Sequence, residues 1–456
     1  MNETARSLTT HPIHHGLGAT VEVEPLFTRD MAWYGGYPEC GDGHFHYCGC
    51  GNRTSTSLTV CAGSSGADAA RYVAQKPRNL AGLTEYSSRS MTTVNVGVFG
   101  TSWWADTMYF PSLDKHPAVA IAAVCGRNPT TAAAFAKTWN VPASYTDAVA
   151  MLEGQDLDAV VIATANDSHY ELAMAAIERG LHVLCEKPMA LNAEQAALMR
   201  DAAAEADVIT MMPFTYHWMP SNQWVRQLIT NGYIGRPLHI NARYYTDFGF
   251  DDSYSWRFDR EIAGSGIIGD LGSHWIHLAR WLLDDTETSV SALASNFVER
   301  GPRPDGTAYD QTEDSVAMTV RYASGAYAML QTSAVCWEGT PFGQTHHYEV
   351  HGDKGTLYAT CDWDTVQKVE GLRRGDTTGR QELPIPDEIW GDVRRDTAHN
   401  TYRDVFRTTS SMTRQWIDAI VAETQVEPSF DEGLAVQRVI DAAVESAAHG
   451  GSVVAL

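Results

Sequence analysis

The chain from residue 94 to residue 212 alternates between short, continuously apolar runs and segments with helical spacing. Strands that are apolar at every position are buried on both faces, as in a parallel sheet covered by helices on both sides. The pattern therefore predicts a doubly wound, Rossmann-type α/β domain. The predicted strands are Val94–Phe99, Ala118–Val124, Leu157–Ala163, Leu181–Cys185 and Val208–Met212, and the predicted helices are Thr130–Trp139, His169–Arg179 and Asn192–Ala206.

After Pro213 the strands become rich in β-branched and aromatic residues and are joined by turn sequences such as Ala323-Ser324-Gly325. Strands joined in this way form an antiparallel or mixed sheet. We expect a Rossmann domain over 91–212 and an α+β substrate and oligomerisation domain over 213–456. The predicted strands are Pro237–Thr246, Ser289–Glu299, Ser315–Tyr322, Gly325–Ala334, Tyr348–His351 and Thr356–Thr360, and the predicted helices are Ser221–Asn231, Gly269–Leu283, Thr413–Glu423 and Glu432–Ala448.

Residues 1–90 show little sustained periodicity and contain four of the eight cysteines. These are Cys40, Cys48, Cys50 and Cys61, with His44 and His46 among them. The spacing does not match paired CxxC knuckles, so we predict no metal site. We interpret the segment as a poorly ordered N-terminal extension. The alternative interpretation is that the natural chain starts at Met91.

Composition narrows the class of protein. Of 456 residues, 44% are apolar and 20% are charged, which is typical of a globular protein. The net charge of −23 argues against a nucleic-acid partner, because phosphate binding needs clustered cationic residues. We see no apolar run of membrane-spanning length and no signal peptide. We therefore expect a cytoplasmic protein with reduced cysteines and no membrane partner.

A glycine-containing turn follows the first predicted strand. Gly100, Ser102 and Ala105 take the three positions of the dinucleotide-binding glycine fingerprint, and Gly100, Ser102 and Trp103 are predicted to contact a cofactor. The motif is weak alone, but it lies between a strand and a helix that can hold phosphate. The second strand ends without an acid, and Arg127 there could pair with a 2′-phosphate. We therefore favour NADP over NAD.

Polar residues also follow the third and fourth strands, at the edge where open parallel sheets build their sites. We expect Thr164, Asn166, His169 and Glu186 to lie near the cofactor. Lys187 would take part in proton transfer there. A single Glu-Lys pair is also typical of a solvated loop, so this pattern needs a second motif.

The second motif is a glycine-rich approach followed by a predicted helix. Asp270 and His274 are spaced i, i+4 and so lie on one face. A histidine can remove a hydroxyl proton while hydride leaves the same carbon, and an aspartate one turn away can orient it or the substrate. Because a lone helical histidine is usually structural, the motif gains weight only beside Lys187.

Together these features resemble the glucose–fructose oxidoreductase and inositol dehydrogenase (Gfo/Idh/MocA) family over residues 94–456. The residues that carry the resemblance are the Gly100 turn, Asn166, His169, Glu186-Lys187-Pro188, Ile234-Gly235-Arg236-Pro237, Trp256-Arg257-Phe258-Asp259, the Asp270/His274 helix and His351-Gly352-Asp353-Lys354-Gly355-Thr356. Three departures stand out. Ser102 and Ala105 replace fingerprint glycines, His277 stands where many members carry an aspartate, and residues 1–90 have no counterpart in the family core.

The resemblance implies a Rossmann domain followed by an open-faced α/β domain that often forms homodimers or homotetramers. It implies hydride transfer between NAD(P) and a carbon of a sugar, sugar derivative or cyclic polyol. Lys187 would then contact the reacting hydroxyl, Asp270 would bind substrate and His274 would be the acid/base. Trp256 and Arg257 would lie near the nicotinamide or the substrate.

Two other functions remain open from the sequence. The first is a sugar-sensing regulatory protein that binds NAD(P) without turnover. The second is an enzyme that uses bound NAD for a transient oxidation, with elimination or glycoside cleavage as the net reaction. The regulator would not need Lys187, Asp270 and His274 together, whereas the second enzyme would use the same residues.

Overall fold

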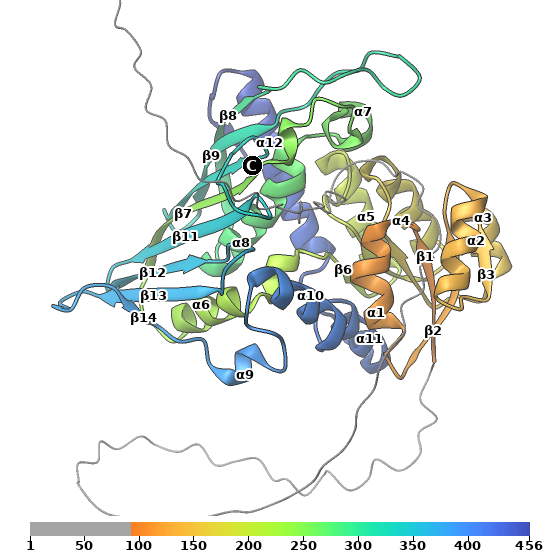
Figure 1. The fold of residues 1–456 in the computed structure, drawn as a ribbon, viewed down its shortest axis with the longest axis horizontal. Coiled ribbons are helices and arrows are strands. Elements are labelled where there is room, and N and C mark those ends of the chain that lie inside the picture. The colour runs from red at the N-terminus through yellow and green to blue at the C-terminus, as the bar shows by residue number, and fades with distance from the viewer. Residues whose placement is uncertain (1–92) are drawn as a thin grey trace, which may run out of the picture. The chain divides into compact units, whose positions relative to one another are not determined.

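A computed structural model describes residues 93–456, which contain two sheets (Figure 1). The expectations for residues 1–90, including the four cysteines there, lie outside the described residues. None of the helices in residues 93–456 is long and apolar enough to cross a membrane.

The first sheet has six parallel strands in the order β3-β2-β1-β4-β5-β6, which confirms the doubly wound fold. The strands are β1 (Val94–Phe99), β2 (Val119–Cys125), β3 (Ala143–Tyr145), β4 (Ala159–Ile162), β5 (His182–Cys185) and β6 (Thr210–Met211). Its helices are η1 (Ala105–Tyr109), α1 (Phe110–Leu113), α2 (Pro129–Thr138), α3 (Ala148–Gly154), η2 (Asn166–Ser168), α4 (His169–Ile177) and α5 (Ala193–Glu205).

The sequence patterns missed β3 and α3. The three residues of β3 form an edge strand that is half-buried or exposed at every position, so they present no apolar run. The strand pairs in parallel with β2 through Ala143 and Tyr145. A backbone pairing of this length can be recognised only when the partner strand is in place.

The second sheet has nine strands in the order β14-β13-β12-β11-β7-β10-β9-β8-β15. It is mixed, because β10 pairs with β7 in parallel while the other neighbouring strands are antiparallel. The strands are β7 (Pro237–Thr246), β8 (Glu287–Ser295), β9 (Ser315–Tyr322), β10 (Tyr327–Ser333), β11 (Gln344–Gly352), β12 (Gly355–Thr360), β13 (Lys368–Arg373), β14 (Gln381–Glu382) and β15 (Val454–Ala455).

Helices cover one face of this sheet, which we call the inner face (Figure 1). The longer helices after β6 are α6 (Pro220–Thr230), α8 (Ser273–Leu283), α10 (Ala398–Thr408), α11 (Thr413–Ala422) and α12 (Phe430–Ala448), and the shorter ones are η3 (Thr215–Trp218), η4 (Phe248–Phe250), η5 (Trp256–Phe258), α7 (Arg260–Ala263), η6 (Ile268–Gly272) and α9 (Asp387–Trp390). Of these, α6, α8, α12 and the π-turn η6 contact the sheet. Side chains on β9 alternate between buried and more exposed positions, as expected for a sheet with one open face.

Two predictions for this half of the chain need correction. The predicted helix Gly269–Leu283 is not one regular α-helix, because its first turn is the π-helix η6. The predicted strand Tyr348–His351 is the end of the longer β11, whose first residues Gln344 and His346 are polar but buried. Polar residues on a buried face hid this part of the strand from a search for apolar alternation.

The C-terminal helices return to the first sheet. On α10, Arg407 donates to the carbonyl of Thr107 in η1 at 3.1 Å. On α11, the Trp416 indole donates to the carbonyl of Ile209 at 3.2 Å. The two halves of the chain therefore contact each other at η1 and just before β6, and a division into domains at residue 212 stays a prediction.

Candidate active site

The turn after β1 brings the backbone close to the neighbouring strand. Gly100 has a φ of +110°, and a Cβ there would lie 2.2 Å from the carbonyl oxygen of Ala163. Its N–H donates to the carbonyl of Cys125 at 2.8 Å, across the strand pair β1–β2. This position therefore requires glycine. The following helix begins with Asp106 N–H donating to Ser102 O at 3.1 Å and continues as the π-helix η1.

The tip of β2 carries the residue predicted to choose between cofactors. Arg127 is exposed and follows Gly126. Asn128 next to it begins α2, and its side chain accepts from Thr130 N and Thr131 N. The arginine therefore projects from a helix start that is fixed by its own cap.

Thr164, Asn166 and His169 lie on the segment after β4. The Asn166 amide donates to the carbonyl of Ala263 at 3.0 Å. His169 is fully buried, with Nδ1 2.9 Å from Pro188 O and Nε2 3.3 Å from Thr164 O. Burial lowers the pKa of His169. These side chains join the ends of β4 and β5 to the Ala263 loop, and their direct contact with a cofactor stays a prediction.

Glu186 links the glycine turn to Lys187. Its buried carboxylate accepts hydrogen bonds from the Trp104 indole and the Tyr109 hydroxyl, both beside the turn, and from Lys187 N–H at 3.1 Å. Burial and the nearby Glu186 charge raise the pKa of Tyr109 well above its usual value. The phenol is therefore protonated and acts as a donor. Cofactor contact by Glu186 stays a prediction, since its oxygens are used within the protein.

Lys187 and Asp270 form the centre of the site. Lys187 Nζ donates to Asp270 Oδ1 at 2.7 Å and to the backbone oxygen of Asp270 at 2.9 Å. Asp270 lies in η6, and π-turns interrupt the regular ladder of α-helical hydrogen bonds. Burial alone would raise the pKa of Asp270, but Lys187 and Arg257 outweigh it and the pKa is lowered. The carboxylate is thus ionised, and it holds the ammonium together with the backbone oxygen of Asp270.

Arg257 approaches the same carboxylate from η5. Its Nε lies 3.5 Å from Asp270 Oδ2, and its guanidinium carbon lies 4.6 Å from the centre of the Trp256 ring. The structure therefore brings Arg257 to the Lys187–Asp270 pair, with Trp256 stacked behind it. Two positive groups on one carboxylate leave positive charge for a further oxygen ligand.

His274 lies on the first turn of α8 and is 7% exposed. Burial, the Lys187 charge and the nearby His346 lower its pKa well below the usual 6.5. Its ring meets Tyr216 edge-on, with 5.1 Å between ring centres. The histidine is therefore neutral near pH 7 and able to accept a proton.

A buried hydrogen-bond network behind His274 was not predicted. The Tyr216 hydroxyl lies 3.1 Å from both Tyr244 Oη and His346 Nε2, and the Gln344 amide donates to Tyr216 Oη at 2.9 Å. His346 points inward and His347 outward, because successive residues of β11 face opposite sides of the sheet. No group of three or more His, Cys, Asp or Glu in residues 93–456 is arranged to hold a metal ion.

His277, where many members of the suspected family carry an aspartate, packs beside this network. It stacks on Phe214 with 4.5 Å between ring centres, and its Nε2 lies 3.2 Å from Nδ1 of His217. Burial and the neighbouring His217 lower the pKa of His277 well below 6.5. A neutral imidazole therefore fills this position and hydrogen-bonds to a second imidazole.

The predicted residues fall into two groups in space. Lys187, Asp270 and Arg257 contact one another, next to the Glu186 link to the glycine turn, and His274 is near enough for the Lys187 charge to lower its pKa. Arg127 lies apart, at the tip of β2. The hydrogen-bond network of Tyr216, Gln344 and His346 could not be predicted from the sequence, because it forms only when β11 and the segment after β6 pack in the same buried layer.

Two family models match the chain. The model described as "Oxidoreductase family, NAD-binding Rossmann fold" matches residues 94–214, and the "GFO/IDH/MocA C-terminal domain" matches residues 222–358. The matched regions coincide with the first sheet and with most of the second up to β12.

Individual relatives agree. The chain is 28% identical over 404 residues to levoglucosan dehydrogenase of Pseudarthrobacter phenanthrenivorans, covering 78% of this chain and 97% of the relative. It is 30% identical over 253 residues to 1,5-anhydro-D-fructose reductase of Ensifer adhaerens, covering 56% and 72%. A solved levoglucosan dehydrogenase in complex with NADH superposes with a TM-score of 0.69 and 26% identity, over 80% of this chain and 99% of that one. The chain belongs to the Gfo/Idh/MocA family of NAD(P)-binding oxidoreductases.

Proposed function

We propose that the protein is an NAD(P)-dependent dehydrogenase or reductase that acts on a CH–OH carbon of a sugar, sugar derivative or cyclic polyol. The observation that carries this proposal is the double hydrogen bond from Lys187 Nζ to Asp270, beside the neutral His274. An ammonium has three donors. With two of them on Asp270, the third is left to meet a substrate hydroxyl oxygen.

The three residues have separate roles in this proposal. In the oxidising direction His274 accepts the hydroxyl proton, and in the reducing direction its protonated form returns it. Lys187 holds the hydroxyl oxygen and stabilises the negative charge that develops there. Asp270 keeps the ammonium oriented, with Arg257 on its second oxygen. When bound, the nicotinamide supplies or accepts the hydride at the same carbon.

The residues at the end of β1 fit a dinucleotide. A side chain on Gly100 would fill the turn, and the strand order reverses between β1 and β4, where dinucleotides bind in this fold. Gly100, Ser102 and Trp103 would hold the pyrophosphate. Residues 125–128 contain no acid to pair with ribose hydroxyls, which supports NADP, with Arg127 on its 2′-phosphate. Since levoglucosan dehydrogenase was solved with NADH, both cofactors need a direct comparison.

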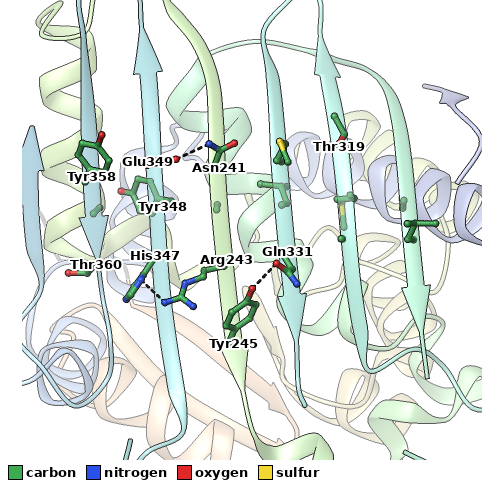
Figure 2. A pocket seen from close by; sticks show the side chains of 18 of the residues that line it. Asn241, Arg243, Tyr245, Thr319, Gln331, His347, Tyr348, Glu349, Tyr358 and Thr360 are labelled. Atoms are coloured by element: carbon green, nitrogen blue, oxygen red, sulfur yellow. Dashed lines mark hydrogen bonds between the residues drawn. The ribbon is translucent and has the colours of Figure 1, made fainter. Parts of the chain in front are cut away.

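We further propose that copies of the chain associate through the outer face of the second sheet, as homodimers or homotetramers. Figure 2 shows this face, which is hollowed by a volume of about 700 Å³. Leu293 and Met329 line the hollow and are 64% and 51% exposed. Arg243 and Glu349 lie on the same face, from adjacent strands. A two-fold axis can bring the apolar residues of one copy against those of the other and can pair Arg243 of one copy with Glu349 of the other.

A substrate panel tests the activity. The protein is assayed with aldoses, ketoses, inositols and sugar acids, each with NADP and NAD in both redox states, by nicotinamide absorbance. We expect turnover that falls roughly 100- to 10,000-fold in Lys187→Ala and in His274→Ala. Arg127→Ala should raise the KM for NADP about tenfold and leave that for NAD unchanged.

Glu382→Gln is the matched control, because Glu382 is exposed on the short edge strand β14 and should keep full turnover. Cofactor binding without turnover of any substrate would contradict the dehydrogenase proposal and favour the sensing regulator.

A further inference from the structure

The π-turn that presents Asp270 is held at its start by one buried carboxylate. Gly266 N–H and Ile268 N–H both donate to Oε1 of Glu313, at 2.7 and 3.1 Å. Glu313 lies just before β9 and is 8% exposed. Backbone N–H groups at a helix start have no partner within the helix. Glu313 therefore supplies the acceptor that the N–H groups of Gly266 and Ile268 lack within their own turn.

The backbone of Glu313 fixes the same segment in register. Ile267 N–H donates to Glu313 O at 3.1 Å. A Cβ on Gly266 would lie only 2.1 Å from that oxygen and 2.6 Å from the Thr312 hydroxyl. The approach to the π-turn and the Glu313 segment are thus in closer contact than any side chain at residue 266 would allow.

The same segment also holds the loop that carries Arg257. Thr312 N–H donates to Phe258 O at 2.9 Å, and Arg260 N–H donates to Asp310 O at 3.0 Å. Residues 310–313 therefore connect the loop of Arg257 to the turn of Asp270. The two side chains that these loops deliver meet at the Asp270 carboxylate, with 3.5 Å between Arg257 Nε and Oδ2.

We infer that Glu313 is a positioning residue, which acts on the reaction by fixing Asp270 and, through it, the Lys187 ammonium. The inference rests on the proposed function, because it concerns the geometry of that same site. Lys187 Nζ depends on two oxygens of Asp270, so a displaced π-turn would withdraw both at once. Small displacements of catalytic groups can cost about 100-fold in rate.

Glu313→Met and Glu313→Gln form the test pair. Methionine fills the volume of the glutamate side chain but provides no comparable acceptor. Glutamine keeps an acceptor, because the N–H groups of Gly266 and Ile268 both bind Oε1 of Glu313, and the amide oxygen of glutamine can replace that atom. We expect kcat to fall roughly 10- to 100-fold in the methionine variant, with NAD(P) affinity unchanged. The glutamine variant should stay within about fivefold of the parent. Glu382→Gln again serves as the control.

A second readout does not depend on turnover. The chain has only six lysines, so acetylation of each by acetic anhydride can be followed by peptide mass spectrometry. Lys115, Lys137, Lys354 and Lys368 serve as internal references. An ammonium held by a carboxylate reacts slowly. We expect Lys187 to react about threefold faster or more in Glu313→Met than in the parent or in Glu313→Gln.

The kcat values and the labelling rates together distinguish a positioning role of Glu313 from no such role. Loss of kcat together with faster labelling of Lys187 supports the positioning role. Unchanged labelling in Glu313→Met, or equal losses in the methionine and glutamine variants, overturns it. If the methionine variant does not fold, Glu313→Asp takes its place, since it keeps the charge but shortens the reach, and parental kcat and labelling there would overturn the inference. If the parent protein shows no turnover, the proposed function is wrong, but the acetylation rate of Lys187 still tests whether Glu313 positions that lysine.

Discussion

The two faces of the nine-stranded sheet carry similar polar residues in opposite surroundings. On the inner face Tyr244 and His346 are 4% and 1% exposed and belong to the network behind His274. One residue along each strand, Tyr245 and His347 point to the outer face and are only partly covered. Burial drives the pKa of His346 down to about 3. The two adjacent histidines of β11 therefore differ in burial, because alternation along the strand places His346 on the covered inner face and His347 on the open outer face.

The difference shows which polar residues the fold must satisfy by itself. A buried polar group without a partner costs free energy, so the inner residues hydrogen-bond to one another. Outer residues such as Arg243, which contacts His347 at 2.8 Å, keep contact with water or with another protein. The inner face serves the site, and the outer face is free to serve assembly.

The largest effect is expected from a charge in the apolar part of the outer face, where Leu293 lies on β8. Leu293→Asp should reduce the molecular mass in solution to that of one chain, because a buried unpaired carboxylate costs several kcal/mol. The measurement is light scattering coupled to size-exclusion chromatography. Val421→Asp is the control, since Val421 is a similarly exposed apolar residue on α11 and lies away from this face. A parental mass of one chain would contradict the interface itself.

A matched pair of histidines sharpens the comparison. His346→Ala removes a hydrogen-bond partner from both Tyr216 and Gln344, so the free energy of unfolding should fall by about 2 kcal/mol or more. His347→Ala loses a half-exposed contact with Asp362 and should cost about 0.5 kcal/mol. Urea unfolding of both variants measures the difference. Equal losses would mean that the inner network contributes no more than the outer pairs.

The pH dependence of stability tests the buried His346 separately. The folded-state pKa of His346 lies below its unfolded value, so its contribution is fully present above about pH 6.5 and is lost as the pH falls toward 3. Between pH 6.5 and 4.5 the parent should lose up to about 1.4 kcal/mol per pH unit on account of this residue. His346→Ala should reduce that slope in unfolding measured at several pH values. An unchanged slope, or an equal change in His347→Ala, would count against a neutral buried His346.

Five of the six strands of the first sheet could be predicted because most of their residues are apolar, whereas β3 was missed. Val94–Phe99 forms β1 at the predicted residues, and the other four predicted strands differ only at their ends. The second sheet was predicted less well, because Gln344 and His346 look like surface residues in a strand that is buried on their side. Their burial depends on Tyr216, which comes more than a hundred residues earlier.

In the candidate site, too, residues marked by a local sequence pattern could be proposed, and residues that depend on distant segments could not. Lys187 was proposed because it follows a parallel strand, and Asp270 and His274 because of their i, i+4 spacing, which the π-turn η6 interrupts. Glu313 gave no signal, since a glutamate before a strand looks like any solvated charge. The π-turn gave none either, because residues 268–272 have no composition that distinguishes π from α. Both features arise only from contacts between distant segments.

The π-turn η6 contains one more residue than an α-helical turn, so it rotates α8, which follows it, about the helix axis relative to the residues before it. Each residue of an α-helix turns the chain by about 100°, so one surplus residue rotates everything after it by that amount. Deleting Gly272 would restore an ordinary helix and rotate His274 about a quarter turn away from Lys187, with its buried neighbours Trp275 and Ile276 following it. The relative orientation of His274 and the Lys187 ammonium is thus set by the number of residues in the turn, and substitutions alone cannot readjust it.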